Sequence, residues 1–285
     1  MIQFVECPRD AMQGIKDFIP TKKKVNYINS LLKVGFDTLD FGSFVSSKSI
    51  PQMRDTAKVL SQLNLGQNDT KLLAIVANKR GVLNAINFDE IQCLGYPFSV
   101  SDIFQKRNTN RSIIKSLELV EEIQKLCLSK NKDLVVYLSM AFGNPYEEKW
   151  DPCIVARQTE LLSEMGIKTI ALSDTIGVST KKTISTLFST LIPSFKNITF
   201  GAHFHTTPTT WKEKVMAAYN SGCIRFDTAI KGFGGCPLAT DELIGNLPTE
   251  KLISFLHENN ETVRLNSLAF ESAYNQAMSI FMTQK

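Results

Sequence analysis

A unit made of an amphipathic helix, a glycine and a short apolar run recurs along this chain. Residues 25–34 lead into the run 35–40, residues 154–165 lead into 166–174, and residues 211–221 lead into 222–227. Glycine directly after a helix is the usual left-handed C-cap, and a short apolar run after it is typical of a buried parallel strand. The repeat therefore predicts parallel β–α–β units.

Further apolar runs complete the set of expected strands. They are Ile2–Glu6, Lys71–Ala77, Glu90–Leu94, Asp133–Ser139 and Ile198–His205. Eight strands that alternate with helices predict a (β/α)8 TIM barrel, whereas the competing doubly wound open sheet usually needs about five or six. We expect one domain over residues 1–285, with a C-terminal helical extension from about residue 240 that covers one end of the barrel or pairs subunits.

Composition excludes several classes of protein. Hydrophobic residues make up 43% and charged residues 21%, as in ordinary globular proteins. The net charge of +4 is spread out apart from Lys22–Lys24, which we expect to be a solvated helix start, so nucleic-acid binding has no support. No apolar run approaches the roughly 20 residues that span a bilayer, so we expect no membrane association.

The cysteines and the first residues bear on the compartment. The six cysteines are scattered and form no close CxxC pair, which predicts reduced thiols, five of them packed in the core. A strand-like segment, Ile2–Val5, begins the chain, so we expect no signal peptide. A cytoplasmic protein is the prediction.

Polar residues gather where the expected strands end, and the reactive groups of a TIM barrel lie at that end. In chain order they are Arg9 and Asp10, Asp40, Asn78 and Lys79, Ser139, Asp174, and His203 with His205. His203 and His205 are two of only three histidines, and their spacing puts both imidazoles on one face of a strand. Both would then reach one divalent cation, although two packed or surface histidines give the same pattern.

Carboxylates would complete such a metal site. Asp10 and Asp40 stand at nearby rim positions, and a mixed nitrogen and oxygen set suits Mg²⁺ or Mn²⁺, with Zn²⁺ or Fe²⁺ left open. The competing interpretations are a capping role for Asp10 and an ion pair for Asp40. Arg9 would stabilise a developing oxyanion or serve in a structural ion pair.

A glycine-rich segment, Gly232–Pro237, follows the last expected strand. Three glycines allow the tight, mobile backbone of a loop that closes over a ligand, and the thiol of Cys236 would then give or take a proton. A phosphate-cradling turn or a loop with a spare cysteine are the alternatives.

Taken together, these motifs resemble the hydroxymethylglutaryl-CoA lyase family, within the superfamily of metal-dependent lyase and synthase TIM barrels. The similar segments, which occur in the same order, are Pro8–Gln13, Ser43–Ser46, Pro51–Met53, Asn144–Glu147, Ser173–Val178, His203–His205, Gly232–Pro237 and Gly245–Glu250. The resemblance implies a divalent-metal-dependent retro-Claisen cleavage of 3-hydroxy-3-methylglutaryl-CoA, or of a close 3-hydroxyacyl-CoA, to acetyl-CoA and acetoacetate. A homodimer is a further expectation from the family.

The resemblance also implies roles for individual residues. The residues that it assigns to Mg²⁺ or Mn²⁺ are Asp10, His203, His205 and Asn246. Arg9 would stabilise the charge of the enolate or carbonyl, and Cys236 would exchange a proton with the acetyl-CoA enolate. Asp174 matches a family aspartate near the metal. Asp10, His203 and Asp174 are the candidates for removing the hydroxyl proton.

Three positions depart from the family pattern. Ala11 replaces a glycine, Asp40 replaces a glutamate, and Thr206 stands where the family commonly has aspartate. Small changes in a pocket shift substrate preference, so the acyl group stays open. A Claisen-condensing acyl-CoA/2-keto acid synthase and a non-catalytic metal-binding barrel are the competing functions.

Overall fold

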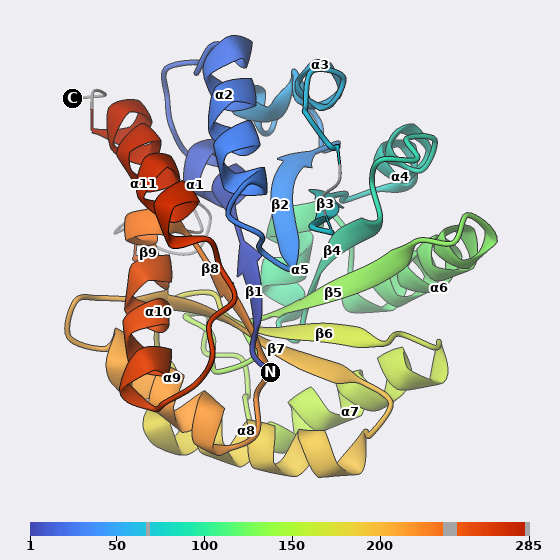
Figure 1. Cartoon of the computed structure of the whole chain (residues 1–285). Coiled ribbons are helices and arrows are strands. Elements are labelled where there is room, and N and C mark those ends of the chain that lie inside the picture. The colour runs from blue at the N-terminus through green and yellow to red at the C-terminus, as the bar shows by residue number, and fades with distance from the viewer. Residues whose placement is uncertain (67–68, 236–243, 283–285) are drawn as a thin grey trace.

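Eight parallel strands close into a barrel in the computed structural model, which describes residues 1–66, 69–235 and 244–282 (Figure 1). The strands are β1 (Gln3–Glu6), β2 (Thr38–Ser43), β3 (Lys71–Ile75), β4 (Cys93–Ser99), β5 (Asp133–Ser139), β6 (Thr169–Asp174), β7 (Thr199–Thr206) and β8 (Arg225–Thr228). Each strand pairs with the next in chain order, and β8 pairs back with β1. This ring confirms the predicted TIM barrel and excludes the open sheet.

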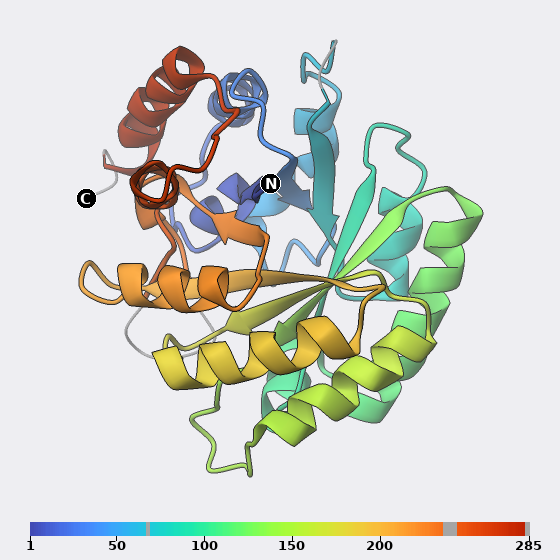
Figure 2. The same ribbon diagram turned by 60° about the horizontal axis from the view of Figure 1, so that its bottom comes forward.

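Helices surround the strands on the outside (Figure 2). They are α1 (Pro8–Gln13), α2 (Thr21–Leu32), η1 (Pro51–Met53), α3 (Thr56–Leu60), α4 (Lys79–Ala85), α5 (Asp102–Thr109), α6 (Ile113–Ser129), α7 (Pro152–Glu164), α8 (Lys181–Ser194), α9 (Trp211–Asn220), η2 (Ile230–Gly232), α10 (Thr249–Glu258) and α11 (Ser267–Phe281). Gly35, Gly166 and Gly222 have φ values of +84°, +80° and +90°, which confirms the predicted left-handed exit from helix to strand.

The C-terminal part adds a short strand and two helices to the barrel. β9 (Gly245–Asn246) pairs antiparallel with β7, and α11 lies beside α2 (Figures 1 and 2). The ring of Phe281 stacks on Phe233 with centroids 4.5 Å apart, so α11 also reaches the segment after β8. The predicted C-terminal helices are confirmed. Within the described ranges, no helix has the length and apolar character needed to cross a bilayer.

Two strands lie later in the chain than the sequence predicts. β4 runs over Cys93–Ser99 rather than Glu90–Leu94, because Gly95 and Pro97 continue the strand despite their poor strand propensity. Pro97 is tolerated since β4 pairs with β3 only as far as Gly95 and then with β5 alone. β2 extends to Ser43, so Asp40 lies within the strand, next to a register shift.

Two smaller expectations are wrong. Lys22 and Lys23 are exposed as predicted, but Lys24 is buried, and its Nζ donates to Asp55 Oδ1 at 2.6 Å and to the carbonyl of Gln52. The burial of Lys24 is possible because Asp55 supplies a counter-charge. Cys153 is exposed, whereas Cys7, Cys93, Cys127 and Cys223 are buried as expected.

The barrel interior is divided between an apolar side and a polar side. The apolar side, contributed by β3 to β6, consists of Leu73, Ile75, Cys93, Val135, Tyr137 and Ala171. The side formed by β1, β2, β7 and β8 instead holds charged and polar groups, including the buried Asp40, Arg225 and Asp227 and the partly buried His203. Buried charges need partners, so this half of the interior is where an organised polar site is expected.

Candidate active site

Asp10, His203 and His205 converge at the carboxyl end of the barrel. Asp10 lies on α1, directly after β1, and the two histidines are on β7. One potential ligand atom from each of the three residues lies within 4.8 Å of the others. The imidazole centroids are 5.5 Å apart, so both rings lie on the same face of β7, as the spacing predicts.

The electrostatics of this cluster suit a divalent cation. Burial raises the pKa of Asp10, but Arg9 and then the two imidazoles outweigh this and hold it below its ordinary value. Burial and the neighbouring His203 lower the pKa of His205. The Nδ1 of His205 lies 2.9 Å from the carbonyl of Thr175, which only accepts, so Nδ1 carries the hydrogen.

The remaining nitrogen of His205 is the observation that tests the fit of a metal. Its Nε2 is buried and has no hydrogen-bond partner among the described residues. A buried polar atom without a partner is costly, and an imidazole nitrogen with a free lone pair is a common metal ligand. The donor set of one carboxylate and two imidazoles therefore fits a divalent cation.

Asn246 reaches the cluster from a distant part of the chain. β9 pairs with β7 so that Asn246 lies opposite His205. The Nδ2 of Asn246 donates to Asp10 Oδ2 at 2.7 Å and to the carbonyl of Phe233 at 2.9 Å. All four residues that the resemblance assigned to the metal thus lie together, and their ligand role stays a prediction.

Arg9 is held by two carboxylates and lines the pocket. Its Nε lies 3.1 and 3.0 Å from the two oxygens of Asp40, and its Nη1 donates to Asp10 Oδ1 at 2.9 Å. Gln13 accepts from the same Nη1 at 2.8 Å. Burial raises the pKa of Asp40 to about 6, while its ion pair with Arg9 opposes the rise. Asp40 therefore orients the guanidinium and does not join the group of metal-ligand atoms around Asp10.

Asp174 ends β6, as predicted, but its carboxylate does not face the cavity, and its catalytic role stays a prediction. Its carboxylate accepts from the backbone and hydroxyl of Ser179 and from Lys214 Nζ at 2.6 Å. Lys214 also donates to the carbonyl of His205 at 2.9 Å. Asp174 belongs to neither group of potential metal-ligand atoms and does not line the pocket, so its carboxylate is linked to the site through Lys214, which also binds the carbonyl of His205.

Cys236 lies outside the described residues, but the glycines before it are described. Gly234 has a φ of +92°, and a Cβ there would lie 2.7 Å from Ala11 Cα and from the Asp10 carbonyl oxygen. Glycine is required because its backbone passes directly over α1. The segment that leads to Cys236 is thus in contact with the Asp10 and Asn246 cluster.

A cavity of about 530 Å³ opens over the cluster. Its lining includes Arg9, Asp10, Tyr137, His203 and His205. A larger hollow of about 840 Å³ lies at the opposite, amino-terminal mouth of the barrel, far from the histidines. The smaller cavity is the candidate substrate site, because it contains the convergent ionisable groups.

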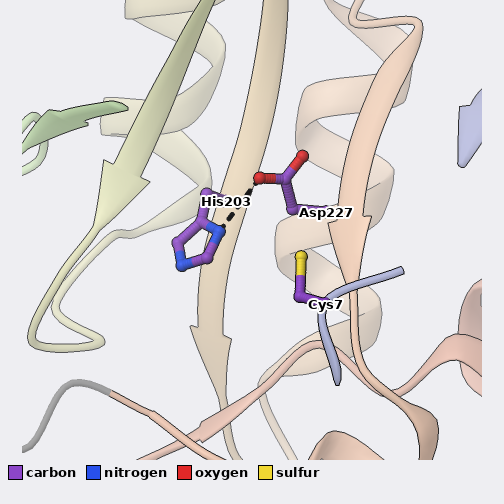
Figure 3. Close-up of side chains that lie close together, drawn as sticks. All are labelled: Cys7, His203 and Asp227. Carbon is purple, nitrogen blue, oxygen red and sulfur yellow. Dashed lines mark hydrogen bonds and ion pairs between the residues drawn. The ribbon is translucent and has the colours of Figure 1, made fainter. Parts of the chain in front are cut away.

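Three further residues in the barrel were missed in the sequence. Asp227 Oδ2 lies 3.1 Å from His203 Nδ1, and Arg225 Nη1 donates to Asp227 Oδ1 at 2.7 Å. Cys7, which we expected only to pack in the core, lies near His203 and Asp227 (Figure 3). Burial alone would lower the pKa of His203, but the hydrogen bond and charge of Asp227 raise it. The alternation of Arg225 and Asp227 along the last strand is a signal that would have identified them.

A TIM barrel with a carboxylate, two imidazoles and an arginine at the carboxyl ends of its strands defines a barrel enzyme with a candidate metal site. The comparisons with known proteins give the family. The chain belongs to the HMGL-like family, whose sequence model matches residues 2–276, and it is a carbon–carbon lyase.

Curated relatives and solved structures agree on this family. The hydroxymethylglutaryl-CoA lyase YngG of Bacillus subtilis is 32% identical over 251 residues, which cover 88% of this chain and 83% of the relative. The mitochondrial hydroxymethylglutaryl-CoA lyase of Bos taurus is 33% identical over 251 residues, which cover 87% of this chain and 76% of the relative. An HMG-CoA lyase from Acinetobacter baumannii, solved in complex with coenzyme A and 3-methylmalate, has a TM-score of 0.92 at 28% identity, with coverage of 99% of this chain and 92% of that chain.

Proposed function

We propose that this protein cleaves 3-hydroxy-3-methylglutaryl-CoA, or a close 3-hydroxyacyl-CoA, to acetyl-CoA and acetoacetate, and that it needs Mg²⁺ or Mn²⁺. The names of its relatives and the coenzyme A bound by a structural neighbour support the substrate class. The observation that carries the proposal is the convergence of Asp10, His203 and His205 beside Arg9 at one cavity.

The reaction breaks the bond between C2 and C3 of the acyl chain. The C3 hydroxyl loses its proton, C3 becomes a carbonyl, and the bonding electrons move to C2 as the enolate of acetyl-CoA. The cation, held by Asp10, His203, His205 and Asn246, would polarise the C3 oxygen and make its hydroxyl more acidic. Arg9 supplies a fixed positive charge for the developing negative charge, because Asp40 holds its guanidinium in place.

Proton transfers complete the balance. The hydroxyl proton passes to a base of the protein. Asp10 and His203 line the cavity, whereas the carboxylate of Asp174 binds Lys214. His203 would use its one lone pair to hold the cation, which leaves Asp10 as the candidate base. The enolate carbon then takes a proton from the thiol of Cys236, which would approach as the glycine-rich segment closes. Asp174 would act on this reaction only by holding Lys214 and the backbone at His205.

The test is release of acetoacetate from 3-hydroxy-3-methylglutaryl-CoA by the purified protein. We expect activity with Mg²⁺ or Mn²⁺, none in EDTA, and losses of at least about 10³-fold in His203→Ala and Cys236→Ala. Cys153→Ala, at an exposed cysteine, is the matched control and should keep full activity. Activity that survives EDTA and both substitutions would overturn the mechanism.

Three other assays address the competing synthase function, the acyl group and the assembly. Free CoA formed from acetyl-CoA and a 2-keto acid, without lyase activity, would identify a condensing synthase instead. A panel of 3-hydroxyacyl-CoA thioesters would define the acyl group. The homodimer and the cytoplasmic location stay predictions, and light scattering on the purified protein checks the first.

A further inference from the structure

Two buried side chains and one partly buried side chain form a hydrogen-bonded line inside the barrel. Arg225 and Asp227 lie two residues apart on β8, so both face inward, and His203 faces them from β7. Asp227 Oδ1 accepts from Arg225 Nη1 at 2.7 Å, and Asp227 Oδ2 lies 3.1 Å from His203 Nδ1. The side chains of Arg225 and Asp227 are 5% and 1% exposed.

We propose that Asp227 is a positioning residue that fixes the tautomer and orientation of His203, and that Arg225 holds Asp227 for this purpose. The inference rests on the metal-dependent function proposed above. An ionised carboxylate can only accept, so the ring nitrogen next to Asp227 is the one that carries hydrogen. The lone pair of a neutral His203 is then on Nε2, on the far side of the ring from Asp227 (Figure 3).

The same arrangement occurs at the second histidine with a different acceptor. His205 directs its Nδ1 to the Thr175 carbonyl and leaves Nε2 without a described partner. Both imidazoles thus place Nδ1 on an acceptor and keep the lone pair of Nε2, and their ring centroids are 5.5 Å apart. Metal-binding histidines usually have this kind of second partner, and removing it typically costs about 10–100-fold in metal affinity.

A glycine on β7 leaves room for the side chain of Arg225. Gly201 precedes His203 by two positions on β7, and a Cβ there would lie 2.6 Å from Arg225 Nη1. The absence of a side chain at Gly201 therefore makes room for the guanidinium that holds Asp227. An arginine inside a barrel is costly to bury unless it is paired, and Asp227 supplies the pair.

Cys7 offers a competing arrangement that the experiment must exclude. Cys7, His203 and Asp227 each place a potential metal-ligand atom within 4.8 Å of the others. An ion bound there through His203 Nδ1 would break the hydrogen bond of that atom to Asp227, and the Cys7 thiol is directed to the Val5 carbonyl at 3.7 Å. The hydrogen bonds in place thus favour positioning over a second metal site.

The first measurement is made on the unsubstituted protein without metal, and a substitution is needed only to assign the signals. The protein has three histidines, so ¹⁵N-histidine NMR with His203→Asn for assignment resolves the ring of His203. At a pH where that ring is neutral, we expect one tautomer with hydrogen on Nδ1. Hydrogen on Nε2, or a fast mixture of both tautomers, would overturn the proposal.

The second measurement is Mn²⁺ affinity by calorimetry. Asp227→Asn should weaken Mn²⁺ binding about 10–100-fold and give a mixture of His203 tautomers, whereas Cys7→Ser should change the affinity less than about threefold. An equal loss in Cys7→Ser would place the ion in the Cys7 arrangement, and an unchanged affinity in Asp227→Asn would refute positioning. If the unsubstituted protein binds no Mn²⁺ but shows the Nδ1 tautomer, the metal-dependent function fails while the hydrogen-bond assignment stands.

Discussion

Glu6 makes the stability of this barrel depend on pH in an unusual direction. Its carboxylate has no exposed surface and accepts from the Ile230 backbone at 2.9 Å, Thr249 Oγ1 at 2.6 Å and Thr228 Oγ1 at 3.3 Å. Burial nevertheless raises the pKa of Glu6 from 4.5 to about 8, against the effect of these hydrogen bonds. The folded protein therefore keeps the proton over a range in which the unfolded chain loses it.

The sign and size of the effect follow from this difference. Because the folded state binds more protons between about pH 4.5 and about pH 8, the free energy of unfolding falls as the pH rises through that window and levels off above it. One pKa unit corresponds to about 1.4 kcal/mol, so the full loss is at most about 5 kcal/mol. Glu6→Gln cannot ionise and should be free of this loss.

The assay is urea unfolding of the wild type and Glu6→Gln at a series of pH values from 5 to 9. We expect the stability of Glu6→Gln relative to the wild type to increase by several kcal/mol, and at most about 5, across the series. Glu118→Gln, at an exposed glutamate on α6, is the control and should follow the wild type. Parallel curves for the wild type and Glu6→Gln, within about 1 kcal/mol at every pH, would refute the reasoning.

Two further predictions concern the packing around the site. Gly234→Ala should lower lyase activity about 10–100-fold, because its Cβ would press on the backbone at Asp10, whereas Cys153→Ala, at an exposed position on α7, should be neutral in the same assay. Asp174→Asn should cost about 3–5 kcal/mol in urea unfolding, because it leaves Lys214 buried without its counter-charge. Adding Lys214→Met to Asp174→Asn should recover part of that loss, and equal stabilities of the single and double variants would show that the unpaired charge is not the cause.

The barrel could be predicted because its signals are local and repeated. A glycine with positive φ commonly ends a helix in any fold, and the short apolar run that follows it is typical of a buried strand. The position of β4 could not be predicted in the same way. Gly95 is favoured there by close neighbours from β3 and β5, since a Cβ would lie 2.6 Å from Ile75 and 3.0 Å from Tyr137, and those neighbours are distant in the sequence.

The part of the candidate site that lies at the ends of the strands could be predicted from the sequence. The convergence of Asp10, His203 and His205 follows from the barrel geometry alone. The partners of these residues follow from tertiary contacts instead. Nothing near His203 in the sequence indicates that its ring bonds to Asp227, because the hydrogen bond crosses from β7 to β8.

The orientation of Asp174 shows what its place at the end of a strand does not specify. Alternate residues of a barrel strand face inward, and on β6 Ala171 belongs to the interior cluster and Ser173 lines the cavity, so Asp174 faces outward. There it meets Lys214 of α9, in the layer between barrel and helices. The same parity puts His203 and Asp227 inside. Assigning inward and outward positions along each strand, before choosing residues at its end, would have separated the groups that face the cavity from those that lie between the barrel and the helices.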